Sequence, residues 1–377
     1  MNTAKILFLA VCLCTSALTH AQIRLSFNPT QGETYVYRFS GEQIANQTVM
    51  GMEMPTTMTT DMLFAMTANS TNDNEVQVEF THKEAGELSL RQTDTGYKVF
   101  IGDELFAGYI TNFAGAPIIY PIVGPNGRHM TRDYPMLTEP YEGRNTSHRH
   151  QRSLWFAHGD VNGYDFWNAF NVPRRIVHQR FAKAESDGQT AVLVTENHWI
   201  AYDELLVSDV RTIRFSVSEN KRIIDFDITI TAEQESVTFG DNREGNIGIR
   251  VTEVLAAATG RGGQFVNAEG GVNEREAWGR RSAWINYHGE MDGERVGIAI
   301  LNHPSSFRYP AYWHTREYGL FAANVFGVGE FERLADRRAG NHTLAQGESF
   351  TLRFRVIFHM GDVDIAEAFE EYRAVHK

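Results

Sequence analysis

The chain has 377 residues, of which 12% are aromatic and 32 are glycines, and its formal net charge is −12. This balance excludes the basic surface that is typical of nucleic-acid-binding proteins. It does not exclude an anionic ligand, because a local cluster of arginines can dominate the potential of a cleft.

The first 21 residues have the pattern of a secretory signal peptide. Lys5 precedes an apolar run over residues 6–18, and small residues follow that run. The run is too short to span a membrane, and no later stretch is continuously apolar over a spanning length. Both cysteines, Cys12 and Cys14, lie within this segment, so we expect a mature chain without disulfides. The sequence therefore predicts a periplasmic or secreted protein with no membrane anchor.

Residues 22–82 differ in composition from the rest of the chain. The segment from Met50 to Met66 is rich in methionine and threonine, and His, Trp and Arg are not concentrated in this region. We predict a small N-terminal β module here, with a boundary near residues 81–86 and a catalytic domain over 83–377.

Apolar and polar residues alternate along much of the remaining chain, as in Ile224–Ile230 and Phe350–Phe358. A period of two is typical of strands with one buried face. Turn-forming segments separate these runs, and only the last segment has a clear helical pattern, capped by Asp364. We predict an all-β fold, a large antiparallel β-sandwich of the supersandwich type, with a short C-terminal helix.

Three clusters of polar and aromatic residues could carry chemistry. The first is a Pro- and Gly-rich loop over residues 120–134, the second is residues 147–167, and the third is residues 302–304 with 312–318. Loops held by a rigid sheet are where functional sites usually lie. The candidate ligand-binding residues in these clusters are Arg128, Arg132, Arg152, Trp155, Asp160, Asn162, Trp313, Arg316 and Asn324.

The spacing of His148, His150, His158 and Asp160 suggests a metal site, because imidazole with one carboxylate suits zinc or a similar ion. Alternatively, these histidines only form hydrogen bonds with loop backbone. We assign no metal and no other cofactor, and keep a divalent ion as the alternative.

Large rings usually fill the interior of a sandwich, so most of the six tryptophans are expected in the core. Trp155 and Trp313 are the exceptions, because charged and imidazole neighbours flank them. Arg250 is interpreted as part of a buried ion pair with Glu244 or Asp241, and contact with a ligand is its alternative role. Arg280 and Arg281 are open between the same two roles. His198, His288 and His359 lie in strand-like segments and are interpreted as structural. A phosphate-binding glycine loop, a Gly-x-Ser-x-Gly elbow and a His-Glu-x-x-His motif are missing from the sequence, which excludes kinase, esterase and zincin functions.

Five ordered motifs resemble the DUF6807 family over roughly residues 85–360: YPIVGPNGRHMTRDYP, RSLWFAHGDVNGYDFW, FGDNREGNIGIRV, AWGRRSAWINYHG and YWHTREYGLFAANVFG. The family is often labelled methane oxygenase, but a methane-oxidising membrane subunit needs spanning helices, which this sequence does not offer. The resemblance instead implies a β-sandwich similar to galactose mutarotase-like sugar enzymes. It also implies that dehydration of a uronic acid at an oligosaccharide end is a plausible activity.

One motif departs from the family. Where the family usually has Asp-His-Pro-His-His-Arg, this chain has Ser147-His-Arg-His-Gln-Arg152. A metal site that depends on the aspartate or on the third histidine would be weakened, whereas an acid–base pair would survive.

Elimination from a uronate needs a base for the proton at C5, an acid for the oxygen leaving C4, and fixed positive groups beside the carboxylate. Histidine and tyrosine are suitable proton carriers, and arginine forks suit a carboxylate. We predict His150 or His314 as base, Tyr318 or His158 as acid, and Arg152 and Arg316 as the carboxylate clamp, with His148 as a further proton carrier. The expected partner is an anionic oligosaccharide.

Three other functions remain open. A glycoside hydrolase would use two carboxylates, such as Asp160 with Glu317 or Asp165 with Glu244. A sugar-binding module would need the aromatic and basic residues only, and a mutarotase-like epimerase is suggested by fold analogy alone.

Overall fold

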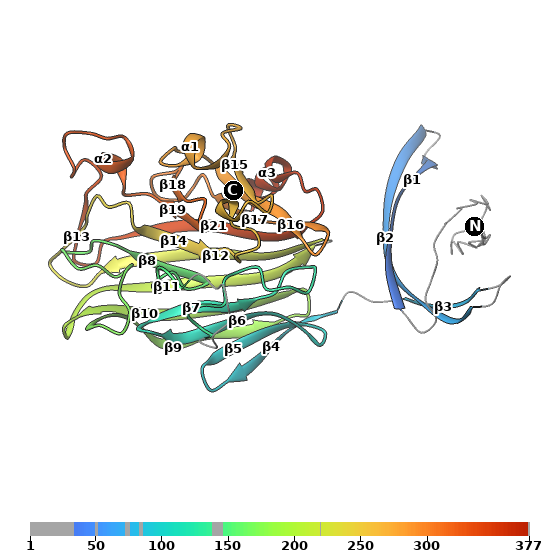
Figure 1. Cartoon of the computed structure of the whole chain (residues 1–377), viewed down its shortest axis with the longest axis horizontal. Helices are drawn as coiled ribbons and strands as arrows, with labels where there is room; N and C mark the ends of the chain where they lie inside the picture. Colours follow the sequence, from blue (N-terminus) through green and yellow to red (C-terminus); the bar gives the residue numbers. More distant parts are fainter. Residues whose placement is uncertain are drawn as a thin grey trace. The chain divides into compact units, whose positions relative to one another are not determined.

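The computed structural model describes residues 34–49, 52–71, 76–82, 86–137, 146–218 and 220–375, and the predicted signal peptide lies outside them. The chain divides into two compact units, residues 1–86 and 87–377. In the first unit, three strands form an antiparallel sheet in the order β1 (Thr34–Val49), β2 (Met52–Thr71) and β3 (Val76–His82) (Figure 1).

The second unit contains two eight-stranded sheets and a two-stranded ribbon. In the order of their strands, sheet I consists of β18 (Tyr312–Thr315), β19 (Leu320–Asn324), β14 (Gly245–Arg250), β8 (Leu154–His158), β7 (Ala116–Ile122), β6 (Glu104–Phe113), β5 (Gly96–Ile101) and β4 (Leu88–Thr93). Sheet II consists of β15 (Gln264–Asn267), β16 (Trp284–Met291), β17 (Glu294–Asn302), β21 (Ser349–Met360), β12 (Lys221–Ala232), β11 (Glu204–Ser218), β10 (Thr190–Ala201) and β9 (Arg174–Ser186). The ribbon pairs β13 (Ser236–Phe239) with β20 (His342–Ala345).

The two sheets pack against each other as a β-sandwich, which confirms the predicted fold class. Buried and partly exposed residues alternate strictly along β10, because one face of sheet II meets the core and the other meets solvent. Aromatic pairs join the sheets: the ring centroids of Phe156 and Trp199 are 6.0 Å apart, and those of Phe106 and Phe215 are 5.7 Å apart.

The outer face of sheet II is partly covered by helix α3 (Ile365–Ala374), which confirms the predicted C-terminal helix. The Asp364 side chain caps it by accepting hydrogen bonds from the backbone N–H groups of Ala366 and Glu367. Apolar residues of α3 pack on β17, β21 and β12. This cover explains why β17 is apolar at consecutive positions rather than alternating.

Four strands of sheet I, β8, β14, β18 and β19, are also buried on both faces. Their inner faces meet sheet II, and their outer faces lie under connecting segments that include the short helices α1 (Asn273–Ala277) and α2 (Val328–Phe331), with a 3-10 turn at Ala257–Thr259 nearby in the chain. Within the described part of the chain, no helix is long and apolar enough to cross a membrane.

Candidate functional site

Strand pairing determines which side chains share the outer face of sheet I. Gly248 pairs with Trp155 on one side and with Ala322 on the other, and Ala322 pairs with His314. Paired residues lie on the same face, so these four positions point the same way. Because the next residue, Phe156, packs on Trp199 of sheet II, Trp155 and its partners face outward. Arg250, two residues after Gly248, faces outward as well.

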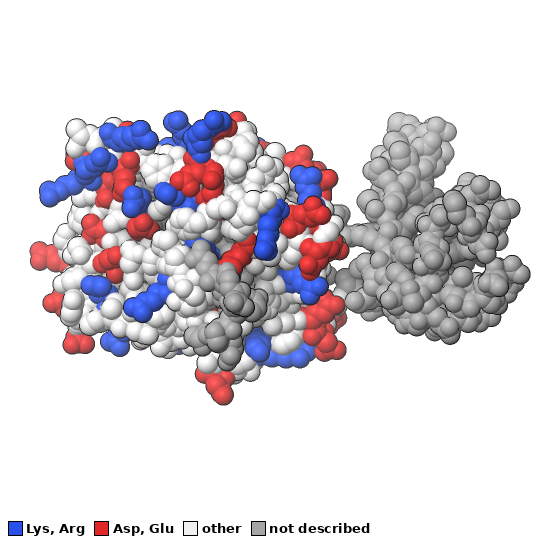
Figure 2. Space-filling view, viewed as in Figure 1, with Lys and Arg blue, Asp and Glu red and all other residues white. Residues whose placement is uncertain are grey.

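A cleft of about 850 Å³ opens beside this face, between α1, β18 and α2. Figure 2 shows basic side chains gathered among acidic ones over the region where Figure 1 draws α1 and α2. The cleft combines guanidinium groups with aromatic rings, a combination suited to an anionic ligand that has an apolar face. Its lining residues are Glu274, Arg275, Trp278, Gly279, Arg280, Arg281, Tyr312, Arg316, Phe331, Glu332 and Arg333.

Gly279 allows the aromatic wall of the cleft to form. It has a φ of 68°, and an added Cβ would lie 3.2 Å from Cδ1 of Phe331. With glycine here, the rings of Trp278 and Phe331 meet edge to face at 5.3 Å. The Gly279 N–H also donates to the Trp313 carbonyl, which joins the end of α1 to β18.

Arg316 stands at one end of the cleft, where its Nε lies 3.0 Å from Oε1 of Glu274. Its Cζ is 6.0 Å from the centre of the Tyr318 ring. Arg316 therefore lies between the cleft and a second group of polar residues around Tyr318.

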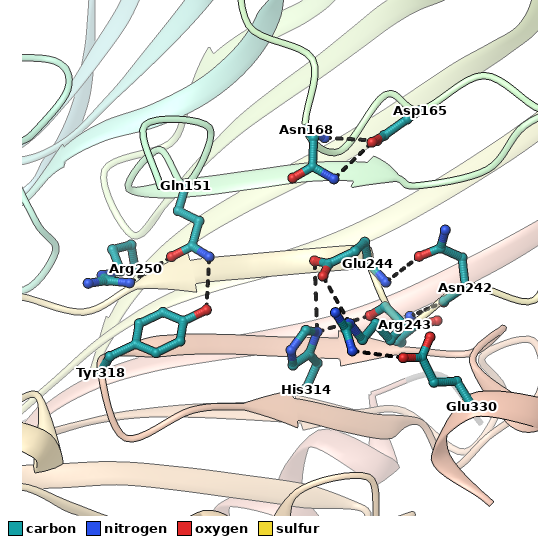
Figure 3. A network of polar contacts seen from close by, with 11 residues as sticks. Gln151, Asp165, Asn168, Asn242, Arg243, Glu244, Arg250, His314, Tyr318 and Glu330 are labelled. Atoms are coloured by element: carbon teal, nitrogen blue, oxygen red, sulfur yellow. Dashed lines mark hydrogen bonds and ion pairs between the residues drawn. The ribbon is translucent and has the colours of Figure 1, made fainter. Parts of the chain in front are cut away.

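The Tyr318 ring is sandwiched between a cation and an imidazole. The His148 ring stacks on it at 4.9 Å with an interplanar angle of 2°, and Cζ of Arg250 lies 4.6 Å from its centre. Gln151 closes the arrangement: its Nε2 donates to the Tyr318 hydroxyl at 3.2 Å, and its Oε1 accepts from Arg250 at 2.7 Å (Figure 3). Burial raises the pKa of Tyr318, so the phenol stays protonated at neutral pH.

The two histidines of this group are kept neutral. Burial and the charges of nearby arginines lower the pKa of His148, which is exposed beside Tyr318. Burial, followed by the influence of His148, lowers the pKa of His150 to about 4. Their ring centroids are 5.9 Å apart. Both imidazoles are therefore unprotonated at neutral pH.

His314 lies behind the aromatic wall of the cleft. Its ring centroid is 6.2 Å from that of Trp278, and its Nδ1 is 3.2 Å from the Arg243 carbonyl and 3.9 Å from Oε2 of Glu244 (Figure 3). Only 5% of the side chain is exposed, and burial lowers its pKa to about 3. Burial also raises the pKa of Glu244, and the negative charge of Asp165 raises it further.

The structure contradicts the predicted roles of two arginines and two tryptophans. Arg152 is fully buried, and its guanidinium donates to the carbonyls of His150, Phe113, Ala114 and Ala169, so it cannot clamp a ligand carboxylate. The guanidinium of Arg132 likewise donates to backbone carbonyls, those of Tyr134, Ser147, His148 and Gln151. Both arginines hold the loop that carries the histidines.

The two tryptophans favoured as ligand platforms, Trp155 and Trp313, are 2% and 0% exposed and belong to the core.

His158 is sealed in the interior, which contradicts its predicted role as acid. Only 1% of it is exposed, its Nε2 lies 2.9 Å from the Gly240 carbonyl, and it packs on Phe239 and Phe326. Strand alternation turns it to the same face as Phe156, away from His314.

The remaining predicted ligand residues make local contacts. Arg128 is exposed and pairs with Asp292, and Asp160 accepts from the Gly163 N–H. Asn162 and Asn324 form hydrogen bonds with backbone groups of neighbouring segments, and Asn324 is fully buried. In the ranges that the structure describes, no three His, Cys, Asp or Glu side chains come together as a metal site.

The prediction missed most of the cleft. The sequence leaves Arg280 and Arg281, beside Trp278, open between a structural and a ligand-binding role, and it does not single out Arg333, which lies two residues after Phe331. The detectable signal was the pair of arginines directly after Trp-Gly. Arg250 was predicted to form an ion pair, but its guanidinium binds the Gln151 amide instead.

Comparisons with other proteins concern the fold and the family. A sequence model described as "Family of unknown function (DUF6807)" matches residues 96–373, and no curated protein matches the chain. A GH36 α-galactosidase from Geobacillus stearothermophilus, in complex with 1-deoxygalactonojirimycin, is similar with 10% identity and a TM-score of 0.37. That alignment covers 74% of this chain, which spans 40% of the galactosidase.

Two smaller proteins are also similar. A galactose mutarotase-like protein from Lactobacillus casei has 9% identity and a TM-score of 0.33, covering 72% of this chain and 100% of its own. A galactose mutarotase related enzyme from Lactobacillus acidophilus has 12% identity and a TM-score of 0.27, covering 73% and 96%. Likeness at this level does not transfer an activity.

Proposed function

This chain belongs to the DUF6807 family, and we propose that it is a carbohydrate-active enzyme that performs an elimination on a uronic acid at the end of an oligosaccharide. The observation that carries the proposal is the cleft of arginines and aromatic rings that ends beside the Tyr318 group. Guanidinium forks match a carboxylate, and the rings offer surfaces for the C–H face of a sugar.

In this proposal, Arg316 binds the carboxylate of the terminal uronate. Offsetting the charge of that carboxylate makes the neighbouring proton at C5 easier to remove. His148, a neutral imidazole exposed beside Tyr318, takes the C5 proton. The electron pair of the C5–H bond forms the C4–C5 double bond, and the C4–O bond breaks.

Tyr318 donates its proton to the oxygen that leaves C4, which departs as water or as the hydroxyl of the next sugar. The raised pKa of Tyr318 keeps the phenol protonated until that step. Since the His148 ring stacks on the Tyr318 ring, base and acid approach from one side of the sugar, which favours a syn elimination. The pattern of residues 1–21 supports action outside the cytoplasm.

The test is incubation with uronate-ended oligosaccharides, followed by mass spectrometry and ultraviolet absorbance. We expect a product that has lost one water, or two fragments of which one is unsaturated, together with the absorbance of the new double bond. Ligand binding without any change of mass would favour a sugar-binding module and overturn the proposal.

A second candidate, hydrolysis of a glycosidic bond, is supported by the raised pKa of Glu244. Burial raises this pKa, the contact with Arg243 lowers it, and the nearby Asp165 raises it, so that Glu244 suits the role of a general acid. Figure 3 shows Glu244 in contact with Arg243. Saturated products and loss of turnover in Glu244→Gln, with turnover retained in Tyr318→Phe, would favour this function over elimination.

A further inference from the structure

We propose that the cleft holds a second anionic group of the same ligand at the end opposite Arg316. This group is a sulfate ester or the carboxylate of the neighbouring sugar. The inference rests on the proposed function, in which Arg316 holds the first carboxylate, and it adds that the preferred ligand carries at least two anionic groups.

The charge of the cleft exceeds what one carboxylate needs. Its lining contains five arginines against Glu274 and Glu332, a local net charge of +3 in a chain of net charge −12. Arg316 is paired with Glu274, and Arg275 is paired with Glu276 at 2.6 Å. The other three arginines, Arg280, Arg281 and Arg333, form no ion pair within the part of the chain that the structure describes.

The arginines are attached at well-separated backbone positions along the cleft. Arg281 forms a backbone bridge with Tyr312, at the start of β18, whereas Arg316 follows the end of that strand. A strand rises about 3.3 Å per residue, so the positions of Tyr312 and Arg316 are about 13 Å apart. An anion bound at the Tyr312 end is therefore distinct from one bound by Arg316.

The Tyr312 end is built for an anion. Arg281 Nε donates to the Pro310 carbonyl at 2.9 Å and its Nη2 donates to the Arg308 carbonyl at 2.8 Å, which fixes the plane of the guanidinium. A guanidinium that is already fixed loses less side-chain entropy on binding. Its Cζ lies 4.9 Å from the centre of the Tyr312 ring.

Arg333 also lines the cleft, and it directly follows a segment that contacts Tyr312. Phe331, two residues earlier, stacks on Tyr312 with ring centroids 5.3 Å apart and an interplanar angle of 27°. The hydroxyl of Tyr312 forms a hydrogen bond with the Glu332 carboxylate, which anchors this segment. Arg281 and Arg333 thus line the same cleft, and Arg281 lies over the Tyr312 ring.

The experiment compares three probes on the full chain by calorimetry: an unsulfated glucuronate–N-acetylgalactosamine disaccharide, the same disaccharide with a sulfate ester on the amino sugar, and digalacturonate. We expect at least one doubly anionic probe to bind about tenfold tighter than the unsulfated disaccharide, because a charge-assisted hydrogen bond contributes about 1.5–3 kcal/mol. In Arg333→Ala this preference falls about tenfold, while the affinity for the unsulfated disaccharide stays the same. If only the sulfated disaccharide binds more weakly to Arg333→Ala than to the wild type, the second anionic group is a sulfate ester. If only digalacturonate binds more weakly, the second group is the carboxylate of the neighbouring sugar.

Arg175→Ala is the matched control, since it removes an exposed arginine from β9 in sheet II with the same change in net charge. Arg280→Ala repeats the test if the Arg333 variant does not fold. Equal affinity of the wild type for all three probes, or equal losses in the Arg333 and Arg175 variants, overturns the second anionic site but leaves the proposed function intact. No binding of any probe to the wild type overturns both.

Discussion

Arginine has two different roles in residues 87–377, structural and ligand-binding. The role depends on whether the donors of the guanidinium are already used by hydrogen bonds within the protein. Arg152 is fully buried and donates to four backbone carbonyls, so it stabilises the loop that carries His148 and His150. Arg316 has a side chain that is 32% exposed, contacts one carboxylate and lines the cleft. The guanidinium of Arg316 can therefore bind a ligand, whereas that of Arg152 cannot.

At this scale, Tyr318→Phe tests the proposed acid. It removes the hydroxyl that Gln151 positions and retains the stacked ring, so turnover should fall about 10²- to 10⁴-fold, as is typical for loss of a general acid. Steady-state kinetics and calorimetry with one uronate oligosaccharide provide the check, and affinity should change little. Tyr202→Phe, at an exposed tyrosine, is the control. Equal turnover in Tyr318→Phe and wild type would rule out the acid role.

Buried histidines predict how stability depends on pH. Burial lowers the pKa of His158 and His359 to about 4 and that of His314 to about 3. The unfolded chain binds these protons near the ordinary value of 6.5, so between 6.5 and 4 the unfolded state holds more protons than the folded state. The contribution of these neutral histidines to the free energy of unfolding should be fully present above pH 6.5. It should decrease as the pH falls toward 4.

Urea unfolding at a series of pH values measures this effect. His158→Asn should reduce the slope of stability against pH between 6.5 and 4, since one buried imidazole is removed. The exposed His129, whose pKa is raised by its hydrogen bond with Asp133, is a control of opposite sign. A stability that rises as the pH falls through this range would contradict the prediction.

Among the elements, the junction of α1 with β18 shapes the cleft. Gly279 has a left-handed backbone and no space for a Cβ beside Phe331. Tyr312 and Arg316 lie on the cleft side because residues two apart on a strand share a face, and Trp313 points to the core for the same reason. Along β18, alternate side chains therefore face the cleft and the core.

Gly279→Ala should destabilise the protein by about 1–2 kcal/mol and also weaken ligand binding, because the left-handed backbone is strained and Phe331 must move. Gly163→Ala is the matched control, with a φ of 83° and no atom within 4 Å of the added Cβ. Chemical unfolding and calorimetry should show a loss of stability in both variants and a loss of affinity only in Gly279→Ala. Unchanged affinity in Gly279→Ala would mean that the position of Phe331 does not shape the cleft.

For the whole molecule, the division into two units predicts that residues 87–377 fold by themselves. Both eight-stranded sheets and α3 lie within that unit. We expect this fragment to unfold in one cooperative transition at the temperature of the main transition of the full chain, as measured by calorimetry. The fragment 87–340 is the control, since it lacks β21, the strand between β17 and β12, and should not fold. Failure of 87–377 to fold would show that the N-terminal residues are required.

The fold class and the C-terminal helix could be predicted from local features of the sequence. Strand periodicity, turn residues and the Asp364 cap are local properties, and the structure follows them. The family was also apparent from the ordered motifs over the second unit.

Which of the chemically suitable residues meet depends on how distant segments of the chain pack together. The alternation of side chains along a strand predicts that His314 and Trp313 point to opposite faces of the sheet. It does not predict which of the two faces the other sheet covers. Nor could the sequence reveal that the donors of Arg152 and Arg132 are used by backbone carbonyls, or that Arg281 and Arg333, 52 positions apart in the printed numbering, line one cleft. Burial and hydrogen-bond partners are set by contacts between distant segments, and a local pattern of residue types does not specify those contacts.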